Sequence, residues 1–86
     1  MINISEIYTE VYNLVEAGQY RLLHKKINDA INKDPVNVLE VVCYIRAAND
    51  CTEQIPEWRD TVLKAKRKID KAGKDADSLL KGIIWH

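Results

Sequence analysis

The sequence predicts an all-α protein, a compact bundle of four to five short helices with a repeat-like helical hairpin at its N-terminus. Three observations lead to this fold class. Apolar residues recur at three- and four-residue steps along most of the 86 residues. Between these periodic segments, where helices begin and end, stand Gly18, Pro35, Pro56 and Gly73. Only residues 38–45 are rich in β-branched side chains, so a sheet would have no second strand.

The first helix is expected from about Ser5 to Ala17. Ser5 is the candidate N-cap, and Glu6 lies in the first turn, where a negative charge is favourable. Gly18 supplies the left-handed residue with which helices often end. The buried face is predicted to consist of Ile4, Ile7, Tyr8, Val11, Leu14 and Val15.

The second helix is expected from about Tyr20 to Lys33. Asp34 and Pro35 end it, because proline disfavours helical geometry at the residue before it. The same pair can restart a helix, with Asp34 as its cap and Pro35 in the first turn. The buried stripe is predicted to consist of Tyr20, Leu23, Ile27, Ala30 and Ile31.

The third segment, from Val36 to Asp50, has two interpretations. A helical stripe is formed by Val38, Val41, Val42 and Ile45, and it is widened by Leu39 and Ala48. The β-branched run at 38–45 is also compatible with a buried strand. Helix is favoured because a lone strand has no partner, but the pattern by itself leaves both interpretations open.

The last third of the chain predicts a loop and two further helices. Residues 49–55 form the loop, and Pro56 opens the fourth helix with Glu57 just inside it. The apolar stripe of this helix is Trp58, Val62, Ala65, Ile69 and Ala72, and Gly73 ends it. Asp75 or Asp77 caps a last short helix, whose apolar residues are Ala76, Leu79, Leu80, Ile83 and Ile84. Residues 1–86 therefore form a single helical domain.

Residues 4–35 resemble one helical hairpin of the tetratricopeptide repeat family. Gly18 and Tyr20 match its Gly-x-Tyr turn, Ala30 its small residue near the helix end, and Asp34-Pro35 its closing pair. Val11 and Leu23 stand where the family prefers small residues, and the segment from Val38 to Gly73 has no Gly-x-Tyr. The resemblance implies a protein-binding surface.

Composition excludes several classes of function. Thirteen basic and thirteen acidic residues give a net charge of zero, so the chain lacks the overall attraction to phosphate of a dedicated nucleic-acid binder. No apolar run approaches the roughly 20 residues that a membrane span needs. The N-terminus has no signal-peptide pattern, so a cytoplasmic location is expected. Abundant isoleucine, asparagine and lysine are typical of AT-rich genomes, including those of phages and mobile elements.

Catalytic and metal-binding motifs are absent from the sequence. Cys43 lies in an apolar run and is predicted in the core, whereas Cys51 is predicted to be exposed. His24 is expected on the surface, and His86 is the last residue. A zinc site would require these four residues to meet by coincidence of fold, because no Cys-x-x-Cys spacing occurs. We therefore expect no enzymatic activity, no cofactor and no metal.

Charge is distributed unevenly along the chain. Residues 1–20 carry a net charge of −3, and residues 56–74 carry +4. Trp58 is predicted in the core, whereas Trp85 is either a contact residue or the last core residue. The candidate binding residues are Glu6, Glu10, Glu16, Lys64, Lys66, Arg67, Lys68, Lys71 and Trp85.

These features predict a small intracellular protein-binding module that acts by occupying a partner's surface. An adaptor, an inhibitor or a phage-encoded modulator of a host factor would fit this description. The alternative is a weak nucleic-acid-binding protein that uses the lysine-rich fourth helix to contact phosphates. The separated charges also permit head-to-tail association of two copies of the chain.

Overall fold

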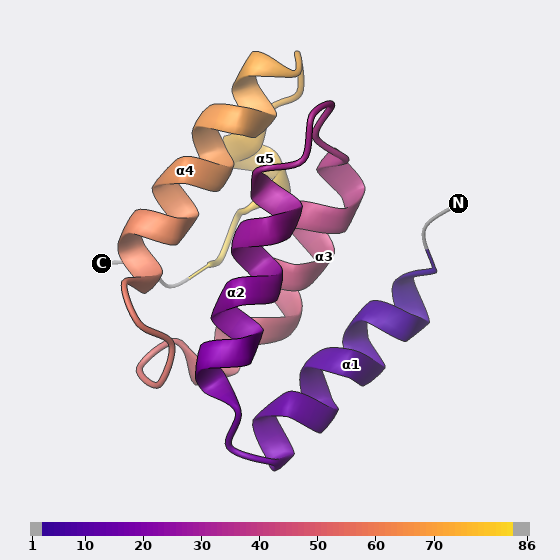
Figure 1. Ribbon diagram of the computed structural model, residues 1–86. Helices are drawn as coiled ribbons and strands as arrows, with labels where there is room; N and C mark the ends of the chain where they lie inside the picture. Colours follow the sequence, from indigo (N-terminus) through magenta and orange to yellow (C-terminus); the bar gives the residue numbers. More distant parts are fainter. Residues whose placement is uncertain (1–2, 84–86) are drawn as a thin grey trace.

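The computed structural model describes residues 3–83, which form five α-helices and one 3₁₀ helix (Figure 1). No strand occurs among these residues, so the all-α prediction is confirmed and the run at 38–45 is helical. The elements are α1 (Ile4–Glu16), α2 (Tyr20–Ile31), α3 (Val38–Ala48), η1 (Asn49–Cys51), α4 (Trp58–Lys71) and α5 (Ala76–Leu79).

The helices are arranged as two antiparallel pairs. Helix α1 runs beside α3 in the same direction, and α2 runs beside α4 in the same direction, so α1 and α4 lie at opposite edges (Figure 1). The molecule measures 35 × 31 × 20 Å, and its shortest dimension equals about two helix diameters. Side-by-side pairs of this kind are the arrangement in which helical hairpins bury the faces that one hairpin leaves open. Within the described range, every helix is too short or too polar to span a lipid bilayer.

The N-cap of helix α1 lies two residues before the predicted one. Asn3, not Ser5, is the N-cap, and its side chain accepts a hydrogen bond from the backbone N–H of Glu6 at 3.2 Å. Asparagine is as good a cap as serine, and the earlier start adds helical residues whose backbone groups are paired. The prediction that Ser5 caps the helix is therefore wrong.

The connection between α2 and α3 also differs from the prediction. Helix α2 ends at Ile31, before Lys33, and the Asp34–Pro35 peptide bond is cis. This pair does not restart the helix. Asn37 is the N-cap of α3, because its side chain accepts the backbone N–H of Glu40 at 3.2 Å. Both α1 and α3 thus begin with the spacing Asn-x-x-Glu, which is close to a capping box.

Helix α4 begins at Trp58 and not at Pro56. Glu57 has a left-handed backbone conformation, with φ of 54°, and lies outside the helix. The turn at Glu57 places Trp58 in the first turn with its side chain buried, as predicted for the core. The predicted glycine stops are confirmed, since Gly18 and Gly73 have φ of 68° and 84°.

The last helix is shorter than predicted. Asp75 caps it, and its side chain accepts hydrogen bonds from the backbone N–H and the hydroxyl of Ser78 at 3.3 and 2.9 Å. These bonds hold the pKa of the Asp75 carboxyl below its usual value. Helix α5 comprises four residues, and the predicted apolar residue Ile84 lies outside the described residues.

One continuous core joins the two helix pairs, and most of the predicted stripes point into it. Its largest fully buried side chains are Leu23, Ile27, Ile31, Ile45, Ile69, Val11, Val41 and Val62. Four residues depart from the predicted burial. Ile4, at 46% exposure, and Ala72 are exposed, although the apolar stripes of α1 and α4 include them. Leu39 is 49% exposed and does not widen the stripe of α3. Cys51 is buried, because η1 turns its thiol inward to donate to the carbonyl oxygen of Ala48 at 3.3 Å.

Candidate binding surface between α2 and α4

The acidic residues of α1 do not form one free surface. Glu10 is half-buried, accepts a hydrogen bond from the Tyr44 hydroxyl at 2.9 Å and pairs with Lys26 at 3.3 Å. It therefore ties α1 to α3 and α2. Glu6 and Glu16 are exposed, and no ion pair holds them among residues 3–83.

Tyr44 is correspondingly part of the fold. Burial and the hydrogen bond to Glu10 raise the pKa of Tyr44 to about 12, with burial as the larger cause. Tyr44 falls outside the main apolar stripe of its helix because its hydroxyl meets Glu10. Tyr12, in contrast, is 61% exposed, and its ring is tilted by 55° against that of Tyr8 at a centroid distance of 6.4 Å.

The basic residues of α4, apart from Arg59 in its first turn, separate into two groups. Lys66 lies on the side of α5 and pairs with Asp77 at 2.7 Å. The others are spaced three, one and three residues apart, and this spacing places them on one helical face. We call this set the basic face, and it consists of Lys64, Arg67, Lys68 and Lys71. The sequence prediction that grouped Lys66 with them is wrong.

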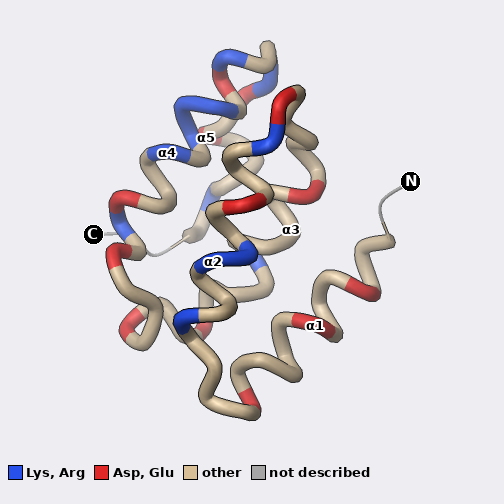
Figure 2. Tube along the Cα trace, in the orientation of Figure 1, with Lys and Arg blue, Asp and Glu red and all other residues tan. Residues whose placement is uncertain are grey.

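The basic face carries uncompensated positive charge. All four side chains are exposed, and within the described part of the chain no ion pair or hydrogen bond engages them. Figure 2 shows basic residues following one another along α4, whereas α1 at the opposite edge carries only acidic ones. Over seven residues the face extends about 10 Å along the helix axis.

The basic face borders a hollow at the end of α2. This hollow, of about 260 Å³, lies between the four cations and the end of α2, where it is lined by Ile31 and by the C-cap residue Asn32. We call it the cationic hollow, because none of the residues in 3–83 that line it carries a carboxylate. Its walls combine charged heads with the methylene stems of lysine and arginine, which offer apolar contact beside the charge.

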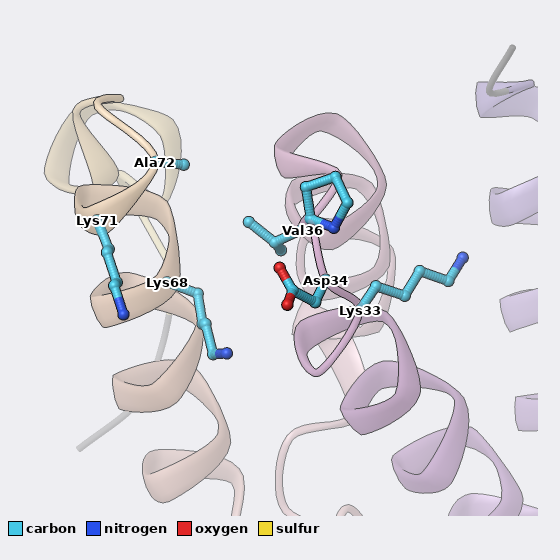
Figure 3. Close-up of a pocket in the computed structure, with 7 residues that line it drawn as sticks. Lys33, Asp34, Val36, Lys68, Lys71 and Ala72 are labelled. Carbon is cyan, nitrogen blue, oxygen red and sulfur yellow. The ribbon is translucent and has the colours of Figure 1, made fainter.

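A second hollow, of about 250 Å³, continues the first toward the end of α4. Lys68, Lys71 and Ala72 line one side, and residues 33–36 line the other. We call it the loop hollow. In Figure 3, Asp34 and Val36 point from the loop toward α4, whereas Lys33 points away. Lys33 pairs instead with Glu40 at 2.7 Å.

Asp34 gives the loop hollow a mixed charge. Its carboxylate is exposed, and it forms no ion pair with Lys68, Lys71 or any other residue in the range 3–83. Lys68 and Lys71 line both hollows, so the two form one groove between α2 and α4. Positive charge fills one end of this groove, and a free carboxylate stands at the other.

A polar contact joins the two helices that border the groove. The Nε2 atom of His24 in α2 lies 3.1 Å from the Thr61 hydroxyl of α4. The side-chain amide nitrogen of Asn28 lies 2.9 Å from the same His24 nitrogen. Thr61 is buried at 2% exposure. The prediction of a surface His24 is wrong, because the side chain turns toward α4 one to two turns before the groove. The contact fixes the separation of the two walls.

The cysteines and histidines do not form a site. Cys43 and Cys51 are free and buried, and burial raises the pKa of both thiols, so both are unreactive core residues. Among the residues described, no three His, Cys, Asp or Glu side chains gather where they could hold a metal ion. His86 and the predicted contact residue Trp85 lie outside the described residues.

Sequence reasoning found the basic face but missed the opposite wall of the groove. The sequence pattern places Asn32 within the second helix and gives Asp34 as the residue that ends this helix or caps the next one. Their place in the groove follows from the parallel course of α2 and α4, because this course brings the C-terminal ends of the two helices together.

Comparison with known proteins gives no relative. No protein-family model, no curated protein and no solved structure matches the chain.

Proposed function

We propose that this protein is a small, non-enzymatic binding module that takes an acidic segment of a partner protein into the groove between α2 and α4. The observation that carries the proposal is the basic face, whose four cations are exposed and unpaired beside the cationic hollow. Charges that the fold itself does not use are available to a partner. Cytoplasmic location and a role as adaptor, inhibitor or phage-type modulator belong to the same proposal.

The shape of the charged region supports a short protein segment as the ligand. The basic face extends only about 10 Å. Asp60 lies one turn before Lys64 on the same side of α4, and Asp34 lines the far end of the groove. A long polyanion would extend past the basic face and meet the carboxylate of Asp60 at one end and that of Asp34 at the other. An acidic segment as short as two helical turns would meet neither. The methylene stems in the cationic hollow also favour a ligand that carries apolar side chains.

Binding of an acidic peptide tests this function. The probe is a fluorescently labelled, acetylated peptide of alternating Glu-Glu-Leu units, titrated with protein and followed by anisotropy. Replacing all four residues of the basic face by glutamine should weaken binding by at least about tenfold, since each exposed ion pair contributes up to about 1 kcal/mol. The fold should remain, because all four side chains are exposed.

A matched control separates the basic face from overall charge. The control variant replaces four other exposed cations by glutamine and so loses the same charge; they are Arg21, Lys25, Arg59 and Lys81. It should bind the peptide nearly as well as the native protein. Equal losses in the two variants would show nonspecific attraction and would contradict the proposal.

Nucleic-acid binding is the second candidate, and the spacing of the basic face favours it. The cations follow one another at intervals of one helical turn or less, and a row of this kind is suited to contacting successive phosphates of a nucleic-acid backbone. If all four cations contacted phosphates of duplex DNA, the logarithm of the affinity would fall with the logarithm of salt concentration with a slope of about −3 to −4. A salt titration with a labelled duplex and a labelled single strand measures this slope. A slope near zero, or no binding at low salt, would exclude this candidate.

A further inference from the structure

Asp34 is the one residue of the groove whose charge opposes the proposed ligand. Its carboxylate projects toward α4 into the loop hollow, beside the two lysines that this hollow shares with the cationic hollow (Figure 3). Within residues 3–83 no cation pairs with it. A neighbouring cation, Lys33, is turned away toward Glu40. The groove thus presents four positive charges followed by a free negative charge.

We propose that Asp34 sets the specificity of the groove, and that the partner segment carries a basic residue directly next to its acidic ones. The acidic residues lie over the cationic hollow, and the basic side chain lies over Asp34. This inference rests on the proposed function, because it concerns the ligand of the same groove. It gives that ligand a direction, with acidic residues followed by a basic one, and a uniformly basic surface could not select for this direction.

Electrostatics makes Asp34 discriminate in two directions. A ligand with negative charge along its whole length places a charge against the Asp34 carboxylate, and like charges in contact are unfavourable. A ligand with a lysine or arginine at that position gains an opposite charge instead. Asp60 is a less suitable partner for this cation, because it lines neither hollow.

Three labelled peptides test the proposal. All share an acidic core of Glu-Glu-Leu units, and they differ only at their ends, with glutamine at both ends, lysine at the C-terminal end or lysine at the N-terminal end. A peptide can lie along the groove in either direction, so both lysine peptides are needed. The one that binds more tightly identifies the direction. Adding lysine lowers the negative charge of the ligand, so on a purely basic surface it would weaken binding.

On the native protein, one lysine peptide should bind about two- to fivefold more tightly than the glutamine peptide, the range expected of one exposed ion pair. In the variant Asp34→Asn this gain should disappear, and the glutamine peptide should bind more tightly than before. The variant Asp50→Asn, which removes an exposed carboxylate outside both hollows, should keep the native preference.

The outcomes distinguish this inference from the function on which it rests. If no peptide binds the native protein, both are wrong. If all three bind but the glutamine peptide binds best and Asp34→Asn changes nothing, the function stands and the role of Asp34 is overturned. Loss of the preference in Asp60→Asn, with Asp34→Asn unchanged, would also overturn it.

Discussion

Helices α1 and α4 lie at opposite edges of the molecule and carry opposite charge, but their charges have different contacts. In α1, Glu10 accepts the Tyr44 hydroxyl and pairs with Lys26, so one of its carboxylates belongs to the packing of three helices. In α4, Lys66 pairs with Asp77. The four cations of the basic face are left without partners among residues 3–83. Charge that is separated along a sequence is therefore available to a partner only where the fold leaves it unpaired.

Removing Glu10 should have the largest effect on stability of any charge in this comparison. We expect Glu10→Ala to lower the free energy of unfolding by about 1–2 kcal/mol, because the Tyr44 hydroxyl loses its charged acceptor. Glu16→Ala, which removes an exposed carboxylate from the same helix, should change it by less than about 0.5 kcal/mol. Denaturant unfolding measures both. Equal changes in the free energy of unfolding would mean that Glu10, like Glu16, makes no stabilising contact.

The same contact should make stability fall at alkaline pH. The pKa of Tyr44 is raised to about 12 in the folded protein from an ordinary value of 10.0. Since the folded value is the higher one, the contribution is fully present below pH 10 and is lost as the pH rises toward 12. Phenolate absorbance should show one tyrosine titrating after the others.

The variant Glu10→Gln sharpens this result. The delayed titration should move toward the ordinary pKa but not reach it, because burial, the larger cause, remains. A single titration of all tyrosines near their ordinary value, in protein that is still folded, would contradict the contact between α1 and α3.

Neutralising the basic face should have the smallest effect on stability. Replacing its four residues by glutamine removes repulsion between like charges three and four residues apart. It also removes the favourable placement of Lys68 and Lys71 in the last turn of α4. These effects oppose each other, so we expect a net change below about 1 kcal/mol. A larger loss, measured by thermal or denaturant unfolding, would show that the cations belong to the fold as Glu10 does.

Much of the fold could be predicted from local sequence. The stripes that end at Gly18 and Gly73 gave helices in the right places, since apolar periodicity and left-handed glycines act within one element. The helix starts were less certain because neighbouring residues compete to cap. Asn3 and Ser5 can both accept a backbone N–H, and the spacing of Asn3 to Glu6 was the signal that decided between them.

The groove depended on contacts between residues far apart in the chain. Lys66 lies two residues from Lys64 and Lys68, so helical geometry alone could have separated it from the basic face. The pairing of Glu10 with Tyr44, 34 residues away, had no local signal. Asp34 likewise became part of the groove only because α2 and α4 end side by side.

Chemical-shift mapping of the acidic peptide on the isotope-labelled protein locates the binding surface residue by residue. We expect the backbone amide signals that move on titration to cluster in residues 31–36 and 64–72, with those of α1 unchanged. Shifts centred on α1, or small shifts spread evenly over all exposed cations, would contradict the claim that the groove between α2 and α4 is the binding surface.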